Sequence, residues 1–169
     1  MATLREIRRR ISGVRNTQKI TKAMKMVAAA RLRRAQEAII SARPYARKLG
    51  ELLRHLVTKV DVNLNALLVG RETKNVLLVV VTADRGLCGS FNSNIIKAAV
   101  QHVRGQSAVN VKVLTIGRKG SDYFGKRDYN VIAKHVGIFT DLGFHHARGI
   151  VQEITDGYLK GEHDRVQII

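Results

Sequence analysis

The feature that most constrains the fold is a stripe of apolar and small residues that continues from residue 4 to about residue 60. Its members recur at steps of three and four residues, close to the 3.5-residue period of helices that supercoil around a partner. Thr3 fits an N-cap, and Glu6 three residues later completes the pattern of a capping box. The pattern predicts one long helix whose coiled-coil seam includes Ile7, Ile11, Val14, Val27, Ala28 and Ala35.

Pro44 lies inside this pattern and removes one backbone donor from the helix. Its ring also crowds the carbonyl of Ile40, so we expect a bend at this level, with two separate helices as the alternative. The periodicity continues in phase beyond the proline, which favours a single bent helix. About 55 residues at about 1.5 Å each predict a rod of roughly 80 Å.

The predicted helix also carries most of the positive charge. Residues 1–60 hold 16 of the 30 Lys and Arg residues but only 3 of the 13 Asp and Glu residues. A net charge of +17 favours a polyanionic partner, which can be a nucleic acid, an anionic membrane surface or an acidic protein. A long basic helix cannot bury its stripe against itself, and the rest of the sequence has no comparable second helix. We therefore expect either a partner chain or a longer protein.

The pattern changes after residue 60. Residues 61–75 are predicted to be a linker, and the continuous run of valine and leucine at 76–81 predicts a strand buried on both faces. Strands alternating with helices predict an α/β domain over 76–169, with a mostly parallel, Rossmann-like sheet covered by helices and incomplete at its C-terminal end. Further strands are expected at 111–116, 129–133 and 165–169, and helices from Asn92 or Ser93 to Arg104, near 120–124 and at 144–159.

The loop at residues 82–92 follows the first strand, where α/β domains bind phosphates. It lacks the Gly-Lys-Ser/Thr ending of a P-loop, which favours a structural turn or a protein contact over a ligand site. In that interpretation its glycines allow positive φ, and Asp84 and Arg85 hold the turn together. Cys88 is the single cysteine, which excludes an intramolecular disulfide. Among apolar neighbours we expect it to be a small buried hydrophobe rather than a reactive thiol.

No group of residues has the spacing of a catalytic or metal site. His145 and His146 are adjacent, so on a helix their rings are expected to point in different directions and not to share a metal ion. The other histidines form no spaced set, and no serine or carboxylate constellation is present. We expect neither a metal site nor a cofactor site.

The basic helix leaves two main classes of partner open. A basic helix followed by leucines resembles a DNA-binding region with a zipper, but Leu49 and Leu56 make a single heptad step. The apolar residues Met24 and Val27 lie within the basic part, whereas a helix that contacts bases in a DNA groove is polar over that length. The residues favour a protein partner; the alternative is a nucleic-acid-binding protein with a basic helical arm.

Two long stretches resemble a known family. ISGVRNTQKITKAMKMVAA at residues 11–29 and DRGLCG at residues 84–89 are similar to the gamma subunit of F-type ATP synthase. GRKG at 117–120 and DYF at 122–124 also resemble that family, and the resemblance follows the whole chain in order. It implies a rotor shaft in which this helix pairs with a C-terminal helix inside a ring of alpha and beta subunits. Family members continue beyond residue 169, so we expect that C-terminal helix to be missing from this sequence.

The resemblance also implies which surfaces meet which partners. The alpha and beta subunits of F1 surround the shaft, and acidic loops of beta face the positions Lys19, Lys22, Met24, Lys25 and Arg31. The α/β domain meets the epsilon subunit and the ring of c subunits of Fo, on the side of the loop that contains Asp84, Arg85, Gly86, Cys88 and Gly89.

The implied activity is mechanical. Rotation of the subunit couples proton translocation through Fo to ATP synthesis or hydrolysis on beta. We therefore expect the chain by itself to be no enzyme, and to bind no nucleotide, cofactor or nucleic acid. Its expected location is peripheral, at the cytoplasmic face of a bacterial plasma membrane, as part of F1.

Overall fold

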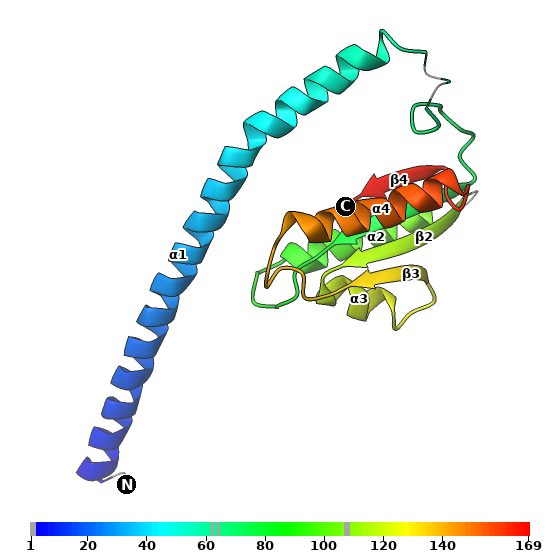
Figure 1. The fold of residues 1–169 in the computed structure, drawn as a ribbon. Helices are drawn as coiled ribbons and strands as arrows, with labels where there is room; N and C mark the ends of the chain where they lie inside the picture. Colours follow the sequence, from blue (N-terminus) through cyan, green and yellow to red (C-terminus); the bar gives the residue numbers. More distant parts are fainter. Residues whose placement is uncertain (1–2, 62, 64, 107–108) are drawn as a thin grey trace. The chain divides into compact units, whose positions relative to one another are not determined.

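The computed structural model describes residues 3–61, 63, 65–106 and 109–169 of the chain. The chain divides into two compact units, residues 1–61 and residues 62–169. The first contains helix α1 (Leu4–Val57), and the second, called here the α/β unit, contains a sheet with helices on both faces (Figure 1).

Helix α1 is a single element of 54 residues. At its start the Glu6 N–H donates to the Thr3 hydroxyl at 3.4 Å, and the Thr3 N–H donates to the Glu6 carboxylate at 3.0 Å. The predicted capping box is therefore present. Pro44 lies inside the helix without ending it, and Figure 1 shows the helix axis changing direction in its upper part. The prediction of one bent helix, rather than two helices, is confirmed.

The sheet has four parallel strands in the order β3-β2-β1-β4. Strand β1 (Asn75–Val81) is central and pairs with β2 (Asn110–Ile116) and with β4 (Arg165–Ile168). Strand β3 (Asn130–His135) completes the sheet beside β2. The predicted class, an α/β fold with a parallel sheet, is confirmed.

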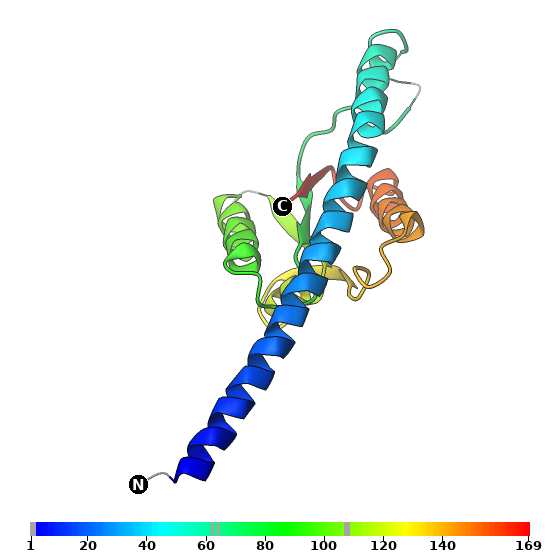
Figure 2. The same ribbon diagram turned by 90° about the vertical axis from the view of Figure 1, so that its left-hand side faces the viewer.

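Helices cover both faces of this sheet. Helices α2 (Phe91–Gly105) and α3 (Arg118–Phe124) pack on one face, and α4 (Phe144–Leu159) packs on the other; Figure 2 shows α2 and α4 on opposite sides of the strands. Successive side chains of a strand point to opposite faces, so β1 supplies both cores. Its even positions belong to a core of Leu78, Val80, Ala99, Val113 and Phe124, and its odd positions to a core of Leu77, Val79, Leu114 and Ile150. This explains why the run at 76–80 is continuously apolar.

Asp164 ties the beginnings of β4 and β1 together. Its Oδ2 accepts the N–H groups of Asn75 at 2.8 Å and of Lys74 at 3.0 Å. These bonds, first the one from Asn75, hold the pKa of the Asp164 carboxyl below its ordinary value of 3.8. Because folding lowers this pKa, the Asp164 carboxylate stabilises the folded chain at pH values above its ordinary pKa. This stabilisation is lost as the pH falls through the pKa of the folded state.

Replacing Asp164 with asparagine is therefore expected to flatten the pH dependence of the free energy of unfolding below about pH 4. Urea unfolding of both chains over the acid range measures this dependence. Asp128→Asn removes an exposed carboxyl of the same unit, and this control should keep the wild-type profile. Superimposable profiles for wild type and Asp164→Asn would contradict the assignment.

Candidate functional site

Helix α1 presents its apolar stripe to solvent. None of its residues from Leu4 to Val57 is buried, and the exposed fractions of Ile7, Val14 and Val27 are 45%, 68% and 55%. The other predicted seam positions, Ile11, Ala28 and Ala35, are exposed as well. A helix gains most of its stability by packing an apolar face, so a stripe of this length calls for a partner surface.

The cations in the middle of α1 lack acidic neighbours on their own helix. The helix has three carboxylates between Leu4 and Val57, and each is engaged elsewhere. Glu6 belongs to the capping box, while Glu37 pairs with Arg33 and Glu51 with Lys48, each at 2.8 Å. The surface of this part of the helix therefore has a positive potential, which favours an acidic partner. The exposed cations that create it are Lys19, Lys22, Lys25 and Arg31.

Met24 connects the two predicted sets of contact residues. It is 65% exposed, and steps of three and four residues place Val27 and Ala28 beside it on the helix surface. Arg31, seven residues later, lies on the same side. The predicted contact residues Met24 and Arg31 thus share one side of α1 with two seam residues instead of occupying a separate face.

Asp84 fixes the loop that follows β1. Its Oδ1 accepts the N–H groups of Arg118 at 2.9 Å and of Gly137 at 3.1 Å, which follow β2 and β3. One carboxylate oxygen therefore joins the loops at the ends of three neighbouring strands, instead of bonding within its own turn as predicted. Its Oδ2 is buried and has no hydrogen-bond partner within the described part of the chain. Arg85 does not act in the predicted way, because its side chain is exposed and its carbonyl makes the contact, with Asn92.

Asn92 closes this loop from the first turn of α2, and the prediction that Asn92 or Ser93 caps the helix is wrong. The cap position is Ser90, whose side chain makes no capping hydrogen bond. Asn92 Oδ1 accepts the Ala83 N–H at 2.9 Å, and Asn92 Nδ2 donates to Cys88 Sγ at 3.0 Å. A polar side chain in the first turn suggests a cap from sequence alone, whereas here the preceding loop folds back over it.

Cys88 is exposed, so the expectation of a buried hydrophobe is wrong. The loop projects outward at this point: Leu87 has φ of 62°, Gly89 has φ of 59°, and both are exposed. Of the two glycines between residues 84 and 89, Gly89 adopts the positive φ predicted for this turn. The tip of the loop is therefore available to a partner.

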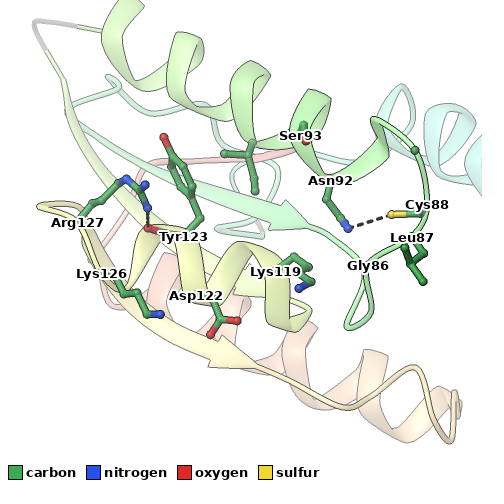
Figure 3. Close-up of a pocket in the computed structure, with 12 residues that line it drawn as sticks. Gly86, Leu87, Cys88, Asn92, Ser93, Lys119, Asp122, Tyr123, Lys126 and Arg127 are labelled. Carbon is green, nitrogen blue, oxygen red and sulfur yellow. Dashed lines mark hydrogen bonds between the residues drawn. The ribbon is translucent and has the colours of Figure 1, made fainter.

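A hollow of about 500 Å³ opens beside the loop (Figure 3). One wall is formed by residues of the loop and of α2, and the other by α3 and the residues that follow it. The Arg127 guanidinium lies 3.8 Å from the centre of the Tyr123 ring. The lining holds the cations Lys119, Lys126 and Arg127 against the single carboxylate of Asp122. This excess of cations suits contact with an acidic surface.

His145 and His146, in the first turn of α4, lie with their ring centroids 4.1 Å apart. The expectation that the two rings diverge is wrong. Side chains in a first turn have no preceding helical turn beside them, so rotamers that bring neighbouring rings together are allowed there.

No helix in the described residues combines the length and the apolar character needed to cross a membrane. Helix α1 is long enough, but charged residues recur along it.

A family model and curated sequences match this chain. The family described as ATP synthase matches residues 3–169. The ATP synthase gamma chain of Chloroherpeton thalassium is 54% identical over the full chain, which spans 58% of that relative. The ATP synthase gamma chain of Prosthecochloris aestuarii is 50% identical, again over the full chain and over 60% of the relative. The chain therefore spans less than two thirds of the length of these relatives.

Solved structures of ATP synthases are also similar. The central stalk/c-ring structure of the Tetrahymena thermophila mitochondrial enzyme matches 89% of this chain and 64% of its own, with a TM-score of 0.68 and 29% identity. The rotor of the Euglena gracilis mitochondrial enzyme matches 95% of this chain and 54% of its own, with a TM-score of 0.59. At 20% identity, the second likeness supports the fold alone.

Proposed function

Because this chain belongs to the ATP synthase gamma-chain family, we propose that it serves as the central-stalk rotor subunit of an F1Fo ATP synthase. Its rotation inside the ring of alpha and beta subunits would couple proton translocation through Fo to ATP synthesis or hydrolysis on beta. The observation that carries this proposal is the 54-residue helix α1, which is basic, striped with apolar residues and uncovered along its length.

The exposure of α1 supports two kinds of contact. The seam of Ile7, Ile11, Val14, Val27, Ala28 and Ala35 suits a second helix, because alanines let another backbone approach closely. The unpaired cations around Met24 suit acidic loops of beta. Exposed ion pairs contribute only about 0–1 kcal/mol each, so they can attract a partner without locking the shaft at one angle.

Coupling then follows from differences between contacts. A helix with different side chains around its axis touches each surrounding beta subunit differently at any given angle. The coupling free energy is the difference between these contacts, and it biases the three catalytic sites unequally. Catalysis itself would remain on beta, and this chain would transmit force without binding nucleotide.

The α/β unit would contact the epsilon subunit and the c ring. The projecting loop supports this proposal with Asp84, Arg85, Gly86, Cys88 and Gly89, and so does the basic hollow beside it. In a bacterium the subunit would sit peripherally at the cytoplasmic face of the plasma membrane, held there by its partners.

Replacing Met24 with lysine in the complete ATP synthase tests the shaft contact. The new cation would face an acidic loop of beta and strengthen a contact that must be released during rotation. We expect ATP-driven proton pumping per ATP hydrolysed to fall by about a factor of 2–5, corresponding to roughly 0.5–1 kcal/mol. The amount of assembled complex in the membrane should stay at the wild-type level.

Met26→Lys is the matched control. Met26 has the same chemistry and a similar exposed fraction, 61% against 65%, but it points to another side of α1. We expect its effect on pumping to be smaller. Unchanged pumping in Met24→Lys, or an equal loss in both variants, would overturn the assignment of this surface.

The alternative, a nucleic-acid-binding protein with a basic helical arm, predicts a different result. An electrophoretic binding assay at about 0.15 M salt should then show tight, sequence-selective DNA binding by the chain. Such binding, together with failure to assemble with alpha and beta, would overturn the rotor proposal. We expect weak, salt-sensitive and non-selective binding instead.

A further inference from the structure

Three potential metal ligands converge where the chain leaves β3 and enters α4. One ligand atom each from Asp141, His145 and His146 lies within 4.8 Å of the other two. Asp141 and His145 are exposed and His146 is half-buried, so an ion from solvent can reach all three. These residues contribute nothing to the rotor surfaces described above.

The His145 imidazole lies close to the backbone at the start of α4. A Cβ added at Gly143, the N-cap of α4, would lie 2.5 Å from His145 Nδ1, so the imidazole packs directly against the glycine backbone. The rings of His145 and His146 are tilted by 43° with their centroids 4.1 Å apart. The side chains are therefore already gathered, and small rotations about exposed bonds can bring the donor atoms to coordination distance.

The charge of the cluster is suited to a cation. A helix N-terminus carries a partial positive charge and by itself disfavours one. The Asp141 carboxylate offsets this effect and completes a set of two nitrogens and one oxygen. Imidazole nitrogen is a typical ligand of zinc and its neighbours in the first transition series, whereas Mg²⁺ and Ca²⁺ prefer oxygen ligands.

We propose that Asp141, His145 and His146 form a surface site for a divalent transition metal of the Zn²⁺ class. Two imidazole nitrogens and one carboxylate oxygen supply three ligands, and a fourth position stays open to water. The bound ion links the segment after β3 to the first turn of α4. The site is independent of the rotor proposal, since it uses other residues and needs no partner subunit.

Calorimetric titration of the full chain with ZnCl₂ tests this site. We expect one Zn²⁺ per chain, and an affinity lowered by His145→Gln or His146→Gln by at least the factor, on the order of 10–100, that the loss of an outer-shell partner costs. His55→Gln is the matched control, because it removes an exposed histidine from α1 and should leave the affinity unchanged. Circular dichroism confirms that each variant is folded before titration.

Two further measurements separate this site from non-specific binding. Excess Mg²⁺ should not displace the zinc, and Zn²⁺ should raise the thermal midpoint of the wild-type chain but not that of His145→Gln. Equal Zn²⁺ affinity in wild type, His145→Gln and His146→Gln would overturn the proposal. Displacement by Mg²⁺ would also overturn it, because it would indicate attraction to carboxylates alone.

Discussion

Replacing Gly117 with alanine is expected to destabilise the α/β unit by about 4 kcal/mol or more. Gly117 lies between β2 and α3 with φ of 93°, a conformation that residues with a Cβ rarely adopt. A Cβ there would lie 1.9 Å from the backbone oxygen of Thr82, which cannot move aside because the Thr82 N–H donates to the Ile116 carbonyl. Backbone strain and a backbone clash therefore act together.

Urea unfolding of the variant measures this loss. Gly149→Ala, inside α4, is the control, because a Cβ there meets no atom within 4 Å and φ is not positive. Alanine at that position should stabilise the chain by about 0.5–1 kcal/mol. A Gly117→Ala chain as stable as the Gly149→Ala chain would refute the role of this close approach.

Replacing Asp84 with alanine is expected to cost about 2–4 kcal/mol of unfolding free energy. The substitution leaves the N–H groups of Arg118 and Gly137 without their carboxylate acceptor. The Arg118 N–H begins α3, whose N-cap Gly117 has no side chain to accept it, so Asp84 supplies the missing cap from another loop. The substitution also removes the buried and unpaired Oδ2. This removal offsets part of the lost unfolding free energy, so the loss should not exceed the upper end of this range.

Hydrogen exchange locates the effect of Asp84→Ala. We expect the amides of Arg118 and Gly137 to lose protection. Amides in the centre of β1 exchange through global unfolding, so their protection should change only by the loss of global stability. Asp122→Ala removes an exposed carboxylate of α3 and should change neither stability nor these two amides. Asp84→Asn keeps one carbonyl acceptor, so its loss of protection should be smaller than that of Asp84→Ala and larger than that of Asp122→Ala. Unchanged protection at both amides in Asp84→Ala would contradict the proposed clamp.

The elements were predictable because their signals are local. The run of valine and leucine at 76–81 predicted a doubly buried strand, and β1 is buried on both faces because α2 and α4 cover them. Thr3 and Glu6, which are three residues apart, predicted the start of α1. Each of these signals acts over a few residues through hydrogen bonding, β-branching or periodicity, and such interactions can be read before the chain is folded.

The loops were predicted less well because their partners are distant. Asp84 was expected to hold its own turn, yet it accepts from residues 34 and 53 positions away. Lys126 and Arg127 entered no sequence-based prediction, although they line the hollow beside that loop. Cys88 was expected to be buried on the basis of its neighbours, whereas it is exposed at a loop tip where Leu87 adopts a positive φ.

The sequence by itself determined that the chain forms one long basic helix with an exposed seam, and an α/β unit whose strands and helices alternate. Periodicity, capping and charge are properties of neighbouring residues, so they can be recognised in the sequence before the fold is known. The tertiary structure alone decided which loop ends meet, Asp84 with Arg118 and Gly137. It also decided how side chains lie within single segments, Asn92 against Ala83 and Asp141 near His145 and His146. The parallel order β3-β2-β1 brings the carboxyl ends of three strands to one edge, and side-chain rotamers then select the contacts made there.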